Sequence, residues 1–185
     1  MNWSDKELVA LCLKKDAKAE KMLYDRFSGQ MFAICLRYMK DRTEAEDVFQ
    51  DGMIKVFQKL HTWKAEGPLG GWMRMIFIHS ALNEIKNYKK MLLSKEENIN
   101  TVDVAPPVVL NEMAEAEIMT LIQNLPVGYR TVFNLFAIEG YSHAEIGKML
   151  NITESTSKTQ FLKAKAKLKS MLVAKTEKEE LIDID

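Results

Sequence analysis

Residues 141–168 of this 185-residue chain carry a pattern that few folds accommodate, namely two short helices separated by a tight turn. Ser142, followed three residues later by a glutamate, forms the capping box that marks a helix start. Asn151 suits the left-handed residue that ends a helix, and Thr153 can cap the next one. Gly147 would let the two helices approach closely. The segment therefore predicts a helix-turn-helix.

The second helix of this pair separates apolar from polar residues at about 100° per position. One stripe must face the core and consists of Phe161, Ala164, Leu168, Met171 and Leu172. The opposite side holds Ser155, Thr159, Leu162 and Lys163, and Lys158 lies along one border of this exposed face. Small polar groups can reach base edges, Leu162 can touch a thymine methyl, and lysines can hold phosphates. We expect contact with duplex DNA here, and the alternative is an ordinary solvated lysine face.

Charge is distributed unevenly along the chain, although 26 basic and 26 acidic residues balance overall. Basic residues exceed acidic ones in 1–90 (16 against 12) and in 121–172 (7 against 3). Residues 91–120 hold one basic and six acidic groups, and residues 173–185 hold two against five. Two basic blocks around an acidic spacer predict two DNA-facing modules joined by a linker.

The remaining periodicity is helical and no strand ladder is evident, which predicts an all-α fold. Helical patterns cover 5–15, 17–40, 43–60 and 71–90, and then 110–124 and 127–139 before the helix-turn-helix. The stretch that ends in Pro106-Pro107 loses periodicity, so the domain boundary is placed there. The predicted organisation is a helical bundle (1–92), a flexible acidic linker (93–109), a helix-turn-helix domain (110–175) and an acidic tail (176–185).

Several classes of protein are not expected. Cys12 and Cys35 lie in helical patterns without a CxxC motif, so they are predicted to be core thiols, and neither a metal nor a cofactor is expected. The chain has no GxGxxG, P-loop, HExxH or nucleophile elbow, so we expect neither an enzyme nor a small-molecule substrate. It shows no leader and no long apolar run, so we expect a cytoplasmic protein without membrane insertion.

The helix predicted over residues 43–60 has an unusual solvent-facing side. Its core stripe consists of Ala45, Val48, Phe49, Met53, Val56, Phe57 and Leu60. Asp47, Gln50, Asp51 and Ile54 fall on the other side at i, i+3, i+4 and i+7. Acidic groups around an isoleucine suit docking to a basic, partly apolar protein element. A solvated face with one stray isoleucine fits the sequence equally well.

The helix predicted over residues 71–90 is apolar nearly all round in its first half. The stripe expected to pack inward is Met75, Ile78, Leu82 and Ile85. The opposite face collects Trp72, Ile76, His79, Ser80, Asn83, Lys86 and Asn87. Aromatic, amide and basic groups suit a strand of nucleic acid, with bases stacked and phosphates on lysines. Core packing explains Trp72 and Ile76 at least as well. Trp63 and Tyr88 are further candidates for stacking, with simple half-burial as the commoner alternative for each.

Three segments, in order, resemble sigma factors of the sigma-70 class, in the extracytoplasmic-function (ECF) group. KMLYDRFSGQMFAICLRYMKDRTEAEDVFQDGMIKVFQKL resembles the second region, whose D-x-x-Q-[DE] patch docks on the clamp helices of core RNA polymerase. GGWMRMIFIHSALNEIKNYKK is similar to the helix that captures the unpaired −10 promoter strand. LPVGYRTVFNLFAIEGYSHAEIGKMLNITESTSKTQFLKAKAKL is similar to the fourth region, which reads the −35 element.

The resemblance assigns a role to each of the three faces. Asp47, Gln50 and Asp51 match the polymerase-docking patch, and Trp72, Ile76 and Asn83 match the −10 pattern. The backbone and base contacts to the −35 element map to Lys158, Thr159, Leu162 and Lys163. Two departures concern sequence preference: His79 stands where asparagine is commoner, and lysines replace the usual arginines at 163 and 165. Because lysine cannot make the bidentate guanine contact of arginine, a different −35 preference is expected.

The resemblance implies an initiation subunit that binds core RNA polymerase and promoter DNA and helps to open the duplex. Polymerase would supply the metal chemistry. Many members of the family are held inactive by an anti-sigma factor and others lack one, so this partner stays open. A free-standing helix-turn-helix regulator is the main alternative, but it leaves the acidic patch and the Trp72 face unexplained. A purely protein-binding helical adaptor is another, and it would show little dependence on salt.

Overall fold

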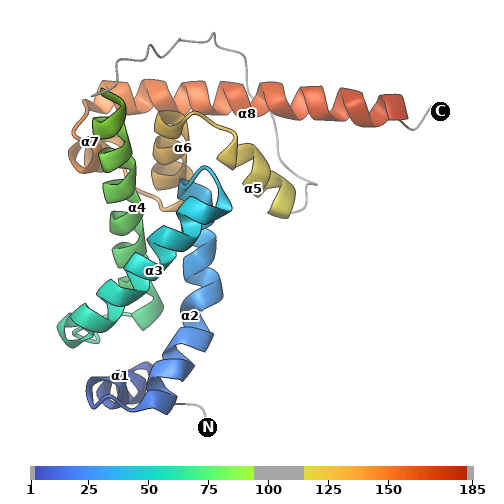
Figure 1. The fold of residues 1–185 in the computed structure, drawn as a ribbon. Helices are drawn as coiled ribbons and strands as arrows, with labels where there is room; N and C mark the ends of the chain where they lie inside the picture. The colour runs from blue at the N-terminus through green and yellow to red at the C-terminus, as the bar shows by residue number, and fades with distance from the viewer. Residues whose placement is uncertain (1–2, 94–114, 183–185) are drawn as a thin grey trace. The chain divides into compact units, whose positions relative to one another are not determined.

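The computed structural model describes residues 3–93 and 115–182, and every regular element in these two ranges is helical. The all-α prediction is therefore confirmed. By its internal contacts the chain divides into two compact units, residues 1–89 and residues 90–185 (Figure 1). The predicted linker, residues 93–109, lies outside the described residues apart from its first position.

Within its described residues, the first unit contains four α-helices and a short 3₁₀ turn. They are α1 (Asp5–Leu13), α2 (Ala17–Tyr38), α3 (Arg42–Lys59), η1 (Leu60–Thr62) and α4 (Leu69–Leu93). Local chemistry explains their starts: Ser4 forms a capping box with Glu7, and the side chain of Asp16 accepts from the backbone N–H of Ala19 at 2.9 Å. The side chain of Asp41 likewise accepts from the N–H of Glu44, at 3.0 Å. Lys15 adopts a left-handed φ of 61° between α1 and α2, which is why α1 ends before the predicted boundary.

The core of this unit is formed by side chains from α1, α2, α3, η1 and α4. Its largest fully buried side chains include Leu8, Leu23, Met31, Ile34, Tyr38, Leu60, Met73 and Phe77. Phe77 of α4 lies against Gly52 of α3, where an added Cβ would come within 2.5 Å of the ring. Phe49 extends the aromatic packing, with its ring centroid 5.7 Å from that of Phe77. α4 therefore approaches α3 at a position without a side chain.

Both cysteines of the chain lie in this unit and are buried. Cys12 of α1 is 3 % exposed and Cys35 of α2 is fully buried, which confirms the prediction of core thiols. Burial raises the pKa of Cys12 to about 11 and that of Cys35 to about 12. Both thiols therefore remain protonated near neutral pH.

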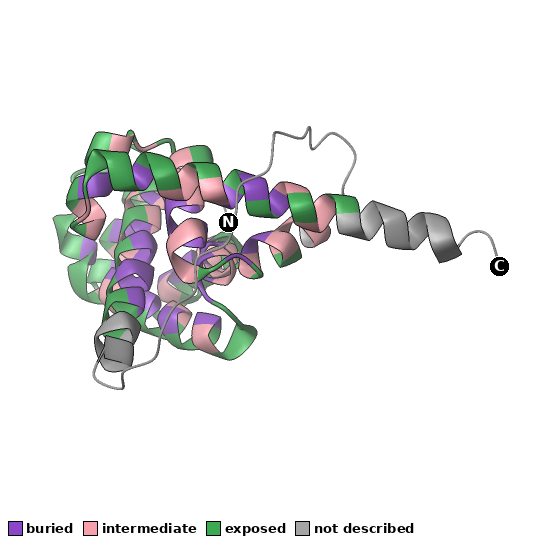
Figure 2. Cartoon of the chain, turned by 90° about the horizontal axis from the view of Figure 1, so that it is seen from above, coloured by how far each residue is buried: buried purple, intermediate pink, exposed green. Residues whose placement is uncertain are grey.

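The second unit is built around its last helix. Its elements are α5 (Glu115–Gln123), α6 (Val127–Phe133), the π-helical turn η2 (Asn134–Ile138), α7 (His143–Leu150) and α8 (Glu154–Ile182). α5, α6 and α7 all pack against α8. Buried and exposed positions alternate along residues 154–173 of α8 as its turns face the core or solvent (Figure 2). The core is formed by Leu125, Ala164 and Leu168 with Leu121, Tyr129, Phe133 and Met171 around them.

Two predicted boundaries in this unit differ from the structure. The single helix predicted over 127–139 is divided into α6 and a π-helical turn, η2. α8 continues to Ile182, so part of the predicted acidic tail is helical. None of the helices in the described ranges combines the length and apolar character that a membrane span requires.

Candidate protein-docking and nucleic-acid interfaces

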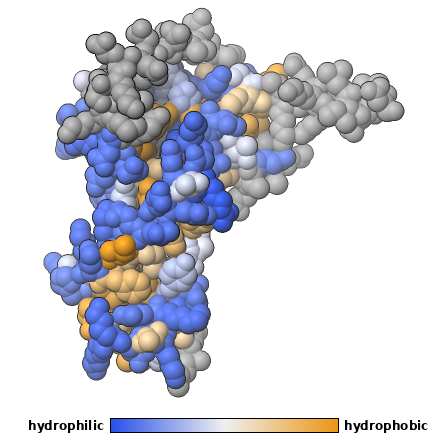
Figure 3. Space-filling view, viewed as in Figure 1, coloured by the Kyte–Doolittle hydropathy of each residue, from blue (hydrophilic) through white to orange (hydrophobic). Residues whose placement is uncertain are grey.

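The outer face of α3 presents the predicted docking patch. Asp47, Gln50 and Asp51 are exposed, and Ile54 is 56 % exposed. Figure 3 shows apolar side chains among hydrophilic ones over α3. The structure therefore brings all four predicted residues to one accessible face, with an apolar side chain beside two carboxylates.

Lys55 connects this patch to α4. Its ammonium group forms an ion pair with Asp51 and donates a hydrogen bond to the hydroxyl oxygen of Ser80, at 3.1 Å. Ser80 is only 4 % exposed. The prediction that placed Ser80 on the exposed face of α4 was therefore wrong, because this hydroxyl turns toward α3 to meet Lys55. Ser80 is a contact between the helices and is removed from the set of DNA-facing residues.

The exposed face of α4 keeps the other six predicted residues. Trp72 and Ile76 are half-buried, and His79, Asn83, Lys86 and Asn87 are exposed. Of the predicted inward stripe, Ile78, Leu82 and Ile85 are buried, but Met75 is 39 % exposed. The buried stripe is rotated toward Leu69, Met73, Phe77 and Ala81, since Phe77 fills the space above Gly52. Aromatic and apolar groups thus lie at the N-terminal end of the exposed face of α4, and amide and basic groups lie farther along the helix.

A cavity of about 400 Å³ lies at the start of this face. It is lined by Thr62, Trp63, Lys64, Glu66, Gly67, Pro68, Gly71 and Trp72. The two tryptophans are predicted candidates for stacking, whereas the sequence pattern did not indicate Lys64 and Glu66. The segment between Trp63 and Trp72 contains glycines and a proline, which predict a turn. Such a turn is the sequence signal that could have indicated Lys64 and Glu66. The cavity offers two indole rings, one cation and one carboxylate, a composition that suits a flat polar group such as a base.

The helix-turn-helix has the local geometry that its sequence predicts. The side chain of Ser142 accepts from the N–H of Glu145, whose carboxylate accepts from the N–H of Ser142, at 2.8 Å. Asn151 ends α7 with a left-handed φ of 54°. The hydroxyl of Thr153 then accepts from the N–H of Thr156 at 3.0 Å. A Cβ on Gly147 would lie 2.9 Å from the carbonyl oxygen of Ile152, so glycine is required for the turn to pass this close.

An aromatic and polar cluster fixes α7 on its neighbours. The ring of His143 stacks on Phe136 with centroids 4.2 Å apart, and its Nδ1 lies 2.9 Å from the hydroxyl of Ser157. Desolvation by burial lowers the pKa of His143, and the positive charge of Lys158 adds to the effect, while Glu154 opposes it. The folded state therefore favours the neutral imidazole, which acts as a packing group of the domain.

The exposed face of α8 carries the five predicted DNA-facing residues. Ser155, Lys158 and Thr159 are exposed, Leu162 is 55 % exposed, and Lys163 is half-buried. Glu154 pairs with Lys158 at 2.6 Å, and this hydrogen bond and charge lower the pKa of Glu154. Lys158 thus has an internal carboxylate partner that a phosphate would have to replace. Within the described ranges, no group of three or more His, Cys, Asp or Glu side chains is arranged to hold a metal ion.

Comparison with known proteins matches both units. Sigma-70 region 2 matches residues 23–91, and Sigma-70, region 4 matches residues 115–168. The ECF RNA polymerase sigma factor SigM of Mycobacterium tuberculosis is 25 % identical over 173 residues, covering 91 % of this chain and 85 % of the relative. The ECF RNA polymerase sigma factor SigW of Bacillus subtilis is 26 % identical over 179 residues, covering 90 % of this chain and 96 % of the relative.

A solved structure shares the fold. It is the sigma factor RpoE of Bartonella quintana in complex with the anti-sigma factor NepR, with a TM-score of 0.51 and 17 % identity over 82 % of this chain and 95 % of that one. The two region matches follow the order and the spacing of the two units. The chain therefore belongs to the sigma-70 family of RNA polymerase sigma factors, in its extracytoplasmic-function group.

Proposed function

We propose that this protein is a transcription initiation factor that binds core RNA polymerase and directs it to promoters through their −35 and −10 elements. The observation that carries the proposal is the pairing of two kinds of surface in one chain. The first unit presents a carboxylate-rich docking face and an aromatic, amide and basic face, and the second presents a helix-turn-helix. Family membership excludes a free-standing helix-turn-helix regulator.

We assign the docking face to core polymerase. Asp47, Gln50, Asp51 and Ile54 form it, and its two carboxylates around an exposed isoleucine favour a basic, partly apolar protein element as its partner. The protein would supply recognition, and polymerase would supply the chemistry, so the chain itself would be no enzyme. It would act in the cytoplasm, where bacterial RNA polymerase works.

We assign DNA contacts to two faces. The α4 residues Trp72, Ile76, His79, Asn83, Lys86 and Asn87 would hold unpaired bases and phosphates of the −10 element, next to the cavity between the tryptophans. The α8 residues Ser155, Lys158, Thr159, Leu162 and Lys163 would enter the major groove of the −35 element. Promoter opening then follows from binding energy, since bases held on α4 are unavailable for pairing.

The test is transcription of fragmented host genomic DNA by purified core polymerase, with and without the protein, with mapping of the RNA start sites. Starts that require the protein and share a −35 and −10 pair are expected. If core polymerase initiates at the same sites with and without the protein, the proposal fails.

A further inference from the structure

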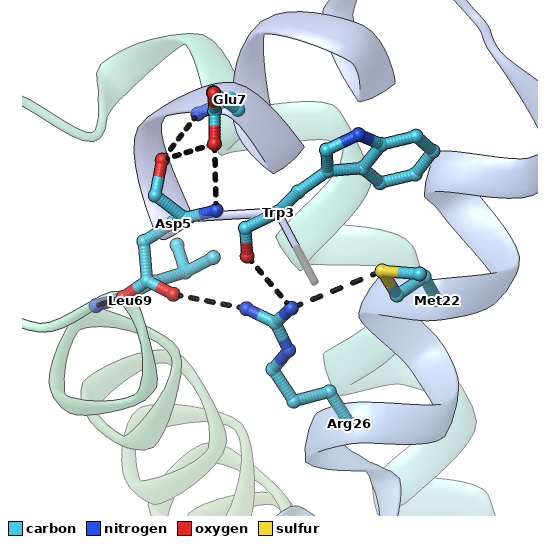
Figure 4. A network of polar contacts seen from close by, with 7 residues as sticks. Trp3, Asp5, Glu7, Met22, Arg26 and Leu69 are labelled. Carbon is cyan, nitrogen blue, oxygen red and sulfur yellow. Dashed lines mark hydrogen bonds and ion pairs between the residues drawn. The ribbon is translucent and has the colours of Figure 1, made fainter. Parts of the chain in front are cut away.

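The start of α4 is held by a residue from the beginning of the chain. The backbone N–H of Leu69 donates to Oδ2 of Asp5 at 3.0 Å, across 64 positions of sequence (Figure 4). The first four N–H groups of a helix have no partner within the helix. Here a carboxylate of α1 provides a cap that is usually supplied by a neighbouring residue.

Arg26 of α2 orients that carboxylate. One guanidinium nitrogen donates to Oδ1 of Asp5 at 3.3 Å, and another donates to the carbonyl oxygen of Trp3 at 2.9 Å and lies 3.8 Å from the sulfur of Met22. The side chains of Arg26 and Asp5 are 27 % and 33 % exposed, so solvent screens the pair only in part. Figure 4 shows Asp5 between Leu69 and Arg26.

A second contact, independent of this pair, holds the same turn of α4. A Cβ added to Gly70 would lie 3.1 Å from the ring of Phe27, which neighbours Arg26 on α2. Leu69 is fully buried. The first turn of α4 is thus held from α1 by a hydrogen bond and from α2 by close packing.

The turn held in this way lies, in sequence, between two sets of residues that line the cavity. The lining residues Glu66, Gly67 and Pro68 precede it, and Gly71 and Trp72 follow it, whereas the two held residues do not line the cavity. A shift of Leu69 and Gly70 would therefore move both parts of the wall and change the distance between the indoles of Trp63 and Trp72.

We propose that Asp5 and Arg26 are positioning residues for −10 recognition, acting through the start of α4 without touching DNA. The inference rests on the proposed function, because the cavity is assigned there to the −10 strand. The pair fixes the width of the cavity and hence which base it accepts. Loss of the pair lowers discrimination between bases, and not only the amount of folded protein.

The test uses holoenzyme assembled with the full-length chain and a promoter found by start-site mapping. Initiation rates are measured on this promoter and on versions with single substitutions in the −10 or the −35 element. For Asp5→Ala, the ratio of rates between the original and the substituted −10 element should fall about threefold or more. The corresponding −35 ratio should stay at its wild-type value.

Asp16→Ala is the matched control, because it removes another aspartate cap in the same unit, at the start of α2 and away from the cavity. It should lower thermal stability by a comparable amount and leave the −10 ratio unchanged. If Asp5→Ala fails to fold by circular dichroism, Arg26→Ala and Arg26→Lys are measured instead, and the lysine should restore part of the ratio.

The inference is overturned if the folded variant, Asp5→Ala or Arg26→Ala, keeps the wild-type −10 ratio. It is also overturned if Asp16→Ala lowers the −10 ratio by the same factor. Failure of the proposed function would give a different result, because wild-type holoenzyme would then show no promoter-dependent starts at all. A result with normal wild-type starts and unchanged ratios rejects only the positioning role.

Discussion

At the scale of single residues, two glycines decide how closely helices approach. Gly52 leaves room for the ring of Phe77, and Gly147 leaves room for the carbonyl of Ile152 in the helix-turn-helix. Both sites are buried and surrounded by atoms that cannot move far. A single methyl group at either position must displace its neighbour, and overpacking of this kind costs about 1–3 kcal/mol.

Gly52→Ala should therefore destabilise the first unit by about 1–3 kcal/mol and lower its melting temperature. Gly29→Ala is the control, because Gly29 also lies within a helix of this unit, but nothing stands within 4 Å of its added Cβ. That change should raise stability by up to about 1 kcal/mol, since alanine is the better helix former. Thermal unfolding followed by circular dichroism compares the two, and equal melting temperatures would contradict the account.

His143 makes the stability of the second unit depend on pH. Because burial lowers its pKa in the folded state, the unfolded chain binds a proton first as the pH falls. The contribution of His143 to the free energy of unfolding is complete above the pKa of the unfolded chain, about 6.5. It is lost as the pH falls through the lower pKa of His143 in the folded state.

Wild-type protein should lose more stability between about pH 7.5 and about pH 5.5 than His143→Gln, whose side chain stays uncharged. Urea unfolding followed by circular dichroism at both pH values measures the difference. The carboxylates with lowered pKa, Glu145 and Glu154, titrate below this window, so they do not obscure it. An equal loss in both proteins would remove His143 as the cause.

At the scale of the elements, local signals predicted the helices well and their rotation less well. The capping residues Ser142 and Thr153 and the left-handed Asn151 are visible in sequence because their partners lie within a few positions. The burial of Ser80 and the exposure of Met75 could not be predicted, since both follow from the contact of α4 with α3.

Contacts between elements also explain why η2 and the hydrogen bond from Leu69 to Asp5 could not be predicted from local sequence. The π-helical turn places Phe136 against His143, a contact between two elements that periodicity within one helix does not reveal. Asp5 caps Leu69 across most of the first unit, and nothing near either residue indicates the other. Long-range partners thus account for the parts of the site that sequence reasoning missed.

For α8, Lys158→Ala should weaken binding of holoenzyme to −35 duplex by about 1 kcal/mol and reduce the slope of log affinity against log salt by about 0.9. The effect is moderated because Lys158 must exchange Glu154 for a phosphate. Lys18→Ala on α2 removes the same charge from an exposed position outside the second unit and serves as control. Fluorescence anisotropy over a salt series gives both quantities, and an unchanged slope would remove Lys158 from the phosphate contacts.

At the scale of the whole molecule, two units share the work of recognition. The first would combine the proposed docking face on α3 with the proposed nucleic-acid face on α4, and Lys55 connects the two helices through Asp51 and Ser80. In the proposed function, the second would read duplex DNA through α8. Overall neutrality conceals this division, because both modules are basic and the stretch between them is acidic. Damage to the docking face should therefore disable the molecule as a polymerase subunit while leaving its fold intact.

Asp51→Lys should abolish or strongly reduce co-purification with core polymerase, since it places a cation opposite a basic partner and beside Lys55. Asp25→Lys is the matched control, because Asp25 is an exposed carboxylate with the same type of i, i+4 lysine partner, on α2. Helical content should be unchanged in both variants. Normal co-purification of Asp51→Lys with core would reject the docking assignment.

The two buried thiols can serve as chemical probes of how often the first unit opens. Cys12 and Cys35 are protonated near neutral pH and sealed by packing, so an alkylating reagent or an oxidant reaches them only when their helices open. Their modification rates would therefore report how often α1 and α2 separate from the core. In the closed state these two thiols would therefore not react directly with an oxidant.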